Sequence, residues 1–147
     1  MSRILALDVG ERRIGVAVSD PGGLVAQPLL VIERKGWEVD LRRITAIVQT
    51  QCVGEVVVGY PLTLSGHVGP QAQRVDRFIA RLRNALSVEV VPWDERFTTA
   101  AAERALLEGD VRRHHRRRVR DALAAALLLQ GYLDRRRRGS RGPGAFL

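Results

Sequence analysis

Residues 3–19 read RILALDVGERRIGVAVS, and this stretch decides the fold of the chain. Residues 3–9 form a largely apolar run, and residues 14–19 form a second run that is rich in β-branched side chains. Both runs are typical of strands. The short polar segment at residues 11–13 predicts that the two strands pair as a hairpin. Asp8 conflicts with the apolar pattern, because it places a carboxylate near the end of the first strand.

Outward from this hairpin, the pattern predicts further strands and helices. Apolar or β-branched runs predict strands, and apolar residues that recur every three or four positions predict helices. A third strand is expected at residues 24–33, where Pro28 marks an edge position or a bulge. The later elements are strands at 55–58 and 88–93, helices at 37–49, 71–86, 98–108 and 119–133, and a loop rich in Gly, Pro, Ser and Thr at 60–70.

This order of elements predicts an α/β fold with a mixed five-stranded sheet and helices on both faces. We expect one domain over residues 1–134, since domains typically hold ~100–150 residues, and a basic, flexible tail over residues 135–147. Cys52 is the single cysteine, which excludes an internal disulfide and favours a reducing, cytoplasmic environment. No apolar stretch reaches the ~20 residues that cross a bilayer, so no membrane partner is expected.

The carboxylate of Asp8 is the first candidate functional group. By strand alternation Asp8 shares a face with Ile4 and Ala6, so its neighbours on that face are expected to be buried. An ionised carboxylate near a core costs several kcal/mol unless a cation or hydrogen bonds compensate it. The alternative is that Asp8 accepts hydrogen bonds from backbone N–H groups in the turn that follows.

Two further acidic positions repeat this conflict. Asp121 lies in line with Ala124, Ala125 and Leu128 on the apolar stripe of a predicted helix, although an ion pair with Arg117 or Arg118 would also explain it. Asp94 and Glu95 lie at the end of an apolar strand, and alternation puts Glu95 on the same face as Val91 and Trp93. The alternative is that one of these two acids caps the helix that follows. The carboxyl ends of strands are where open α/β sheets build their sites.

A divalent cation would allow three such carboxylates to converge, because it offsets their mutual repulsion. Oxygen ligands without cysteine, and without a pair of histidines at zinc spacing, favour Mg²⁺ or Mn²⁺. His114 and His115 are adjacent, so a helix would not direct both of them at one metal ion. We assign these two histidines to the basic surface.

The positive charge of the chain is concentrated in its last quarter. Residues 1–108 hold 13 basic and 13 acidic side chains, whereas residues 109–147 hold 11 arginines against three acids, so the net charge of +8 lies there. A one-sided basic region is typical of a protein that binds a polyanion. Nucleic acid is therefore the expected partner, although from the charge alone an acidic membrane surface or an acidic protein is the alternative.

Four segments resemble the conserved blocks of one known family. They are residues 8–20 (DVGERRIGVAVSD), residues 57–62 (VVGYPL) followed by Ser65 and Gly66, residues 94–99 (DERFTT) followed by Ala102 and Glu103, and residues 121–133 (DALAAALLLQGYL). In this order and spacing they resemble the YqgF family, the RuvC-like proteins described as Holliday junction resolvases and as pre-16S ribosomal RNA nucleases. The resemblance covers residues 1 to about 133.

The resemblance implies a ribonuclease H-like fold in which Asp8, Glu95 and Asp121 form an acidic, metal-binding triad. These are the residues that the burial argument selects. The chain departs from the family pattern at Tyr60, where Leu is usual, and at Thr63 and Ser65, where Asn and Asp are usual. The departures all lie in the second block, so they bear on the substrate more than on the chemistry.

Together these features predict a divalent-metal-dependent endonuclease that cuts structured RNA or branched DNA. The arginines expected to hold phosphates are Arg12, Arg96, Arg112, Arg113, Arg116, Arg117 and Arg118. The alternative is a nucleic-acid-binding factor in ribosome assembly or transcription with little nuclease activity. A third interpretation, the phosphate loop of an actin-like sugar kinase, is disfavoured because such enzymes need two domains and this chain has the length of one.

Overall fold

A mixed five-stranded sheet with the strand order β3-β2-β1-β4-β5 forms the centre of the structure. The structure is a computed structural model that describes residues 2–61, 69–94 and 116–139. Strand β1 (Arg3–Val9) is central, and it pairs antiparallel with β2 (Arg13–Ser19) and parallel with β4 (Val53–Tyr60). The predicted hairpin is thus confirmed.

The two edge strands complete the sheet. Strand β3 (Ala26–Glu33) pairs antiparallel with β2, and β5 (Glu89–Asp94) pairs parallel with β4. The pairing of β3 shifts register next to Pro28, so this proline lies both on an edge strand and at a bulge. That position suits a residue without an N–H group.

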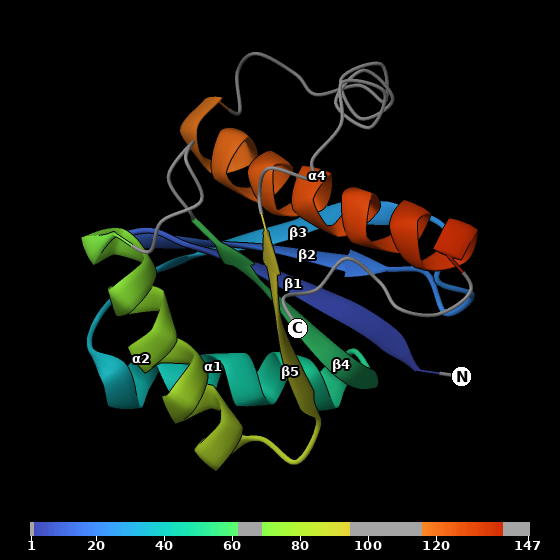
Figure 1. Ribbon diagram of the computed structural model, residues 1–147. Helices are drawn as coiled ribbons and strands as arrows, with labels where there is room; N and C mark the ends of the chain where they lie inside the picture. The colour runs from blue at the N-terminus through green and yellow to red at the C-terminus, as the bar shows by residue number, and fades with distance from the viewer. Residues whose placement is uncertain (1, 62–68, 95–115, 140–147) are drawn as a thin grey trace.

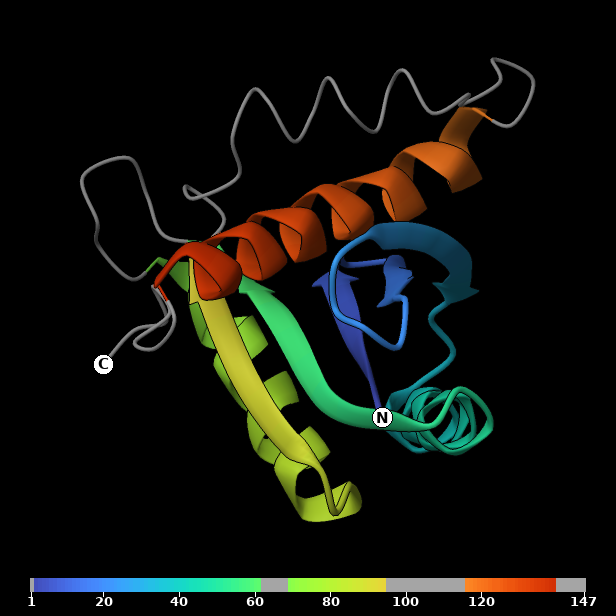
Figure 2. The same ribbon diagram turned by 90° about the vertical axis from the view of Figure 1, so that its right-hand side faces the viewer.

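Helices cover both faces of the sheet, as Figures 1 and 2 show. Helices α1 (Trp37–Thr50) and α2 (Pro70–Ala85) lie on one face, and α4 (Arg116–Gly139) crosses the other. The α1/α2 side has a core of large apolar side chains that includes Leu5, Leu7, Ile44, Phe78 and Leu82. The α/β fold predicted from the sequence is confirmed.

Small residues let α4 lie close to its face of the sheet. The core between them contains Ala6 and Ala17 from the strands, Ala125 and Ala126 from the helix, and Trp93 of β5. The Trp93 ring meets the ring of Tyr132 edge-on, with 5.1 Å between centroids. Helix α4 packs on β1, β2 and β3 through this interface, so the helix is held at a defined position over the hairpin.

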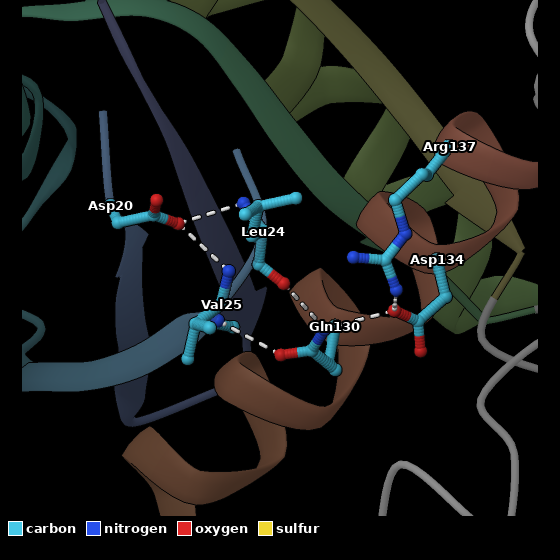
Figure 3. Close-up of polar contacts among 7 residues, drawn as sticks. Asp20, Leu24, Val25, Gln130, Asp134 and Arg137 are labelled. Atoms are coloured by element: carbon cyan, nitrogen blue, oxygen red, sulfur yellow. Dashed lines mark hydrogen bonds and ion pairs between the residues drawn. The ribbon is translucent and has the colours of Figure 1, made fainter. Parts of the chain in front are cut away.

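A polar contact anchors the C-terminal half of α4 to the connection between β2 and β3 (Figure 3). Gln130 Oε1 accepts a hydrogen bond from the N–H of Ala26 at 2.9 Å, and Gln130 Nε2 donates to the Leu24 carbonyl at 3.0 Å. Across the same connection, Asp20 Oδ1 accepts from the N–H groups of Leu24 and Val25. The amide of Gln130 therefore satisfies backbone groups that the edge of the sheet leaves unpaired.

The ends of several elements differ from the sequence prediction. Helix α4 begins at Arg116 and continues to Gly139, so residues 135–139, which we expected in the flexible tail, are helical. Arginine is a good helix former, and Arg136 and Arg137 are held by ion pairs to Glu55 and Asp134. The predicted helix at 98–108 and residues 140–147 of the predicted tail lie outside the described residues. Within the described ranges, no helix has the length and apolarity needed to cross a membrane.

Candidate active site

Asp8 lies near the carboxyl end of β1, on the face of the sheet that α4 covers. Ile4 and Ala6, four and two positions earlier, belong to the core beneath α4, as strand alternation predicts. Burial raises the pKa of the Asp8 carboxyl, and the negative charge of Asp121 raises it further. Two acids that are far apart in the sequence are therefore close enough in space to repel each other.

A glycine on the neighbouring strand brings Asp121 to this position. Gly15 of β2 is the register partner of Asp8. A Cβ atom added to Gly15 would overlap the backbone carbonyl of Asp121, with the carbonyl carbon only 2.6 Å away. The backbone of α4 thus rests directly on β2 beside Asp8, and this contact requires a residue without a side chain.

Arg13 is a cation of this site that the sequence analysis did not select. Its Nη1 lies 4.0 Å from Asp121 Oδ2, and its Nε lies 3.2 Å from Glu33 Oε2. The signal was available, because Arg13 is two residues before Gly15 and four before Ala17, which face α4. Arg117 and Arg118, our alternative partners for Asp121, lie in the first turn of α4, and their side chains are outside the described set.

The turn after Asp8 is held by its own backbone and by Arg34. Gly10 N–H donates to the Arg13 carbonyl at 2.8 Å, and Arg34 Nη1 donates to the Gly10 carbonyl at 3.1 Å. Asp40, which is fully buried, accepts from Arg34 Nε and from the N–H of Lys35. No N–H group among the described residues donates to the Asp8 carboxylate, so turn capping does not explain Asp8.

The third predicted acid, Glu95, lies outside the described residues, directly after the end of β5. The last residue of β5, Asp94, is buried and pairs in register with Tyr60 of β4. Trp93 belongs to the core on the α4 side, and the partly buried Val91 packs against that core. The assignment of Glu95 to that same face stays a prediction.

The predicted phosphate-binding arginines are described only in part. Arg12 is exposed in the turn between β1 and β2, close along the chain to Asp8. Arg116, Arg117 and Arg118 begin α4, the helix that carries Asp121, and their side chains are not described. Arg96, Arg112 and Arg113 fall outside the described ranges. The nucleic-acid surface therefore stays a prediction for most of its members.

Two carboxylates, and not three, come together in the described part of the chain. No three His, Cys, Asp or Glu side chains within it are grouped so that they could hold a metal ion. Asp8 and Asp121 nevertheless supply the donors that suit a hard cation, because both are carboxylates and their charges repel each other. The pair fits a Mg²⁺ or Mn²⁺ ion that Glu95 would help to bind.

Comparison with known families gives one match over almost the whole chain. Residues 2–135 match the family described as "RuvX: Holliday junction resolvase". The chain belongs to the RuvX family. The match begins before Asp8 and ends after Asp121, so it covers all four blocks found in the sequence and confirms the resemblance stated above.

Relatives in this family carry the name "Putative pre-16S rRNA nuclease". The relative from Desulforudis audaxviator (strain MP104C) is 50% identical over 137 residues, which cover 93% of this chain and 97% of the relative. The relative from Symbiobacterium thermophilum (strain DSM 24528 / JCM 14929 / IAM 14863 / T) is 49% identical over 145 residues, or 99% of each chain. The alignments therefore leave little of this RuvX-family chain unmatched.

Solved structures with a similar fold are RuvC proteins. "T. thermophilus RuvC in complex with Holliday junction substrate" matches with a TM-score of 0.63 and 18% identity, covering 97% of this chain and 99% of that one. A second match, "Thermus thermophilus RuvC structure", has a TM-score of 0.62 and 18% identity, covering 96% of this chain and 99% of that one. At this identity the likeness shows the fold alone, which is RuvC-like and thus ribonuclease H-like, as expected.

Proposed function

We propose that this RuvX-family chain is a divalent-metal-dependent endonuclease whose reaction centre is formed by Asp8, Glu95 and Asp121. The observation that carries the proposal is that the backbone at Asp121 rests on Gly15, the strand partner of Asp8, so that two acids far apart in the sequence lie near each other. Their repulsion and the burial of Asp8 are unfavourable for folding, since an uncompensated carboxylate near a core costs several kcal/mol. A bound cation would offset both the repulsion between the two carboxylates and the cost of burying Asp8.

Asp8 and Asp121 would hold a Mg²⁺ or Mn²⁺ ion together with Glu95. When bound, such an ion supplies Lewis-acid activation of water and stabilisation of the leaving oxygen in phosphodiester hydrolysis. Arg13 would help to position Asp121, since its Nη1 lies 4.0 Å from Asp121 Oδ2. Gly15 keeps the backbone of α4 against β2, and so keeps Asp121 near Asp8.

The substrate in this proposal is a structured nucleic acid that is held through its phosphates. Relatives are named for pre-16S rRNA, and the RuvC structure contains a Holliday junction. Arg12, Arg96, Arg112, Arg113, Arg116, Arg117 and Arg118 would bind backbone phosphates, which position a strand without reading its sequence. We favour 5′-end processing of pre-16S rRNA, in the cytoplasm, because the relatives with that name are the more similar.

A cleavage panel with the Asp8→Asn variant tests the proposal. The wild-type protein should cut a pre-16S rRNA fragment or a four-way DNA junction with Mg²⁺ or Mn²⁺, and Asp8→Asn should lose at least ~100-fold in rate while still binding the substrate. Asp20→Asn, which removes a carboxylate far from the site, is the matched control. Binding without any cleavage by the wild-type protein would instead support the nucleic-acid-binding factor.

A further inference from the structure

A basic pocket lies on the face of the sheet opposite to Asp121, beside the carboxyl end of β1. It has a volume of about 410 Å³ and opens between the turn after β1 and the first turns of α1 and α2. Val9 and Gly10, the two residues that follow Asp8, form one wall. The pocket is therefore next to the candidate reaction centre along the chain, although it is built from other residues.

Three arginines from separate parts of the fold line this pocket. Arg34 precedes α1, and Arg74 and Arg77 project from the first half of α2, whereas Glu11 is the one acid among the described lining residues. Arginine binds phosphate and carboxylate through a planar fork of N–H donors. The excess of guanidinium groups therefore favours an anionic ligand.

Arg34 forms a fixed wall of the pocket, because other groups of the protein already hold its guanidinium. Its guanidinium contacts Asp40, donates to the Gly10 carbonyl and lies over the rings of Trp37 and Phe78, 5.2 Å and 5.4 Å from their centroids. These contacts fix the Arg34 side chain beside the turn that follows Asp8. A preformed wall lowers the entropic cost of binding.

Arg74 and Arg77, in contrast, are available to a ligand. Neither makes an ion pair or hydrogen bond to another described residue, and both are exposed at the rim. They are three positions apart on α2, so their side chains point to the same side of the helix. Two uncommitted guanidinium groups on one side of a pocket can hold a single phosphate between them.

We propose that this pocket binds a backbone phosphate of the nucleic acid that is cut at Asp8. The inference rests on the proposed function, because it assigns the pocket to the same substrate. A strand that passes over the carboxyl end of β1 leaves the α4 side and meets Gly10 and then the arginines of α2. Arg74 and Arg77 are thus binding residues in addition to those predicted from the sequence.

Salt-dependent binding of a nucleic acid without cleavage tests the pocket. An Arg74→Gln/Arg77→Gln variant is made in the Asp8→Asn background, and its affinity for a four-way DNA junction and for an RNA hairpin with a 5′ extension is measured in EDTA at several KCl concentrations. Loss of one phosphate contact should weaken binding ~10-fold. It should also make the negative slope of log K against log salt shallower by about 1. The matched control is Arg42→Gln/Arg43→Gln, which removes the same charge from exposed positions on α1 outside the pocket.

The outcomes separate the pocket from the proposed nuclease activity. A shallower slope in the Arg74/Arg77 variant and an unchanged slope in the Arg42/Arg43 control would support the pocket, whether or not the wild-type protein cuts. Equal changes in both variants, no change in either, or no binding of either probe by the Asp8→Asn parent would overturn it. Cleavage by the wild-type protein together with an unchanged slope would overturn the pocket alone. A circular dichroism spectrum like that of the parent confirms that each variant is folded.

Discussion

The backbone of Gly15 lies against the backbone carbonyl of Asp121, with no room for a side chain between them. Gly15→Ala should therefore force α4 away from β2 and lower the free energy of unfolding by about 1–3 kcal/mol, the usual cost of overpacking a core. Urea denaturation measures this loss. Cleavage should fall more than stability accounts for, because the same shift moves Asp121 away from Asp8.

Gly54→Ala is the control for this prediction. A Cβ atom at Gly54 would meet Ser2, which is exposed and precedes β1, so only the N-terminal residues would have to shift and the cost should stay below ~1 kcal/mol. Equal losses in the free energy of unfolding for the two variants would show that the contact between Gly15 and Asp121 does not constrain the position of α4. Unchanged cleavage by folded Gly15→Ala would contradict the role given to the position of α4.

The raised pKa of Asp8 predicts how the stability of the protein depends on pH. A carboxyl whose pKa is raised on folding keeps its proton to higher pH when folded, so its ionised form lowers stability above both pKa values. Without divalent ions, Asp8→Asn should thus be more stable than wild type at pH 7. The difference should shrink as the pH falls through the raised pKa toward the ordinary value of 3.8.

The pKa of Asp20 is shifted in the opposite direction, so Asp20 should have the opposite effect on the pH dependence of stability. Hydrogen bonds from the N–H groups of Val25 and Leu24 lower the pKa of Asp20, so its ionised form stabilises the folded state. The contribution of Asp20 is present above the ordinary pKa of an aspartate and is lost as the pH falls through its lowered pKa. Asp20→Asn should accordingly be less stable than wild type at neutral pH. Chemical denaturation at pH 3 to 8 measures both variants, and a destabilised Asp8→Asn at pH 7 would refute the assigned burial of Asp8.

Divalent cations should stabilise the folded protein if Asp8 and Asp121 bind them. A ligand at 100 times its Kd adds ~2.7 kcal/mol to the free energy of unfolding, because it binds only the folded state. The midpoint of thermal unfolding should therefore rise with Mn²⁺ or Mg²⁺ in the wild type. Asp8→Asn and Asp121→Asn should each lose this response, whereas Asp134→Asn on the same helix should keep it.

Asp40 holds the turn after Asp8 through Arg34. Asp40→Asn removes the charge that Arg34 pairs with in a fully buried position, and we expect a loss of about 1.5–3 kcal/mol, as for a hydrogen bond to a charged group. Urea denaturation checks the value. The released Arg34 would no longer support the Gly10 carbonyl, so substrate affinity should fall as well. Glu33→Gln, which weakens an exposed pair with Arg13, should cost less than ~1 kcal/mol.

Local patterns were enough to predict the sheet and the face on which Asp8 lies. Alternation in β1 placed Asp8 with Ile4 and Ala6, and both are packed under α4. The apolar stripe predicted beside Asp121 was also found, since Ala125 and Leu128 are buried and Ala124 is partly buried. These patterns depend on neighbours two to seven positions away, which a single sequence displays.

Contacts between distant segments were the part that the sequence did not display. The approach of Arg13 to Asp121 depends on how α4 crosses the hairpin, and the extra turn of α4 is held by Arg136 and Glu55, which are 81 positions apart. The pocket at Arg74 and Arg77 likewise needs two helices and a turn to meet. Such pairings follow from tertiary packing, and no local spacing encodes them.

The order of the elements has a consequence for the protein during its synthesis, because α4 follows all five strands of the sheet along the chain. The apolar surface formed by Ile4, Ala6, Ala17 and Val57 has no cover until the ribosome has translated α4 and the helix has left the exit tunnel. Until then Asp8 has no Asp121 beside it. A nascent chain would thus hold Asp8 without Asp121, so any activity that needs both acids would begin only after α4 had folded onto the sheet.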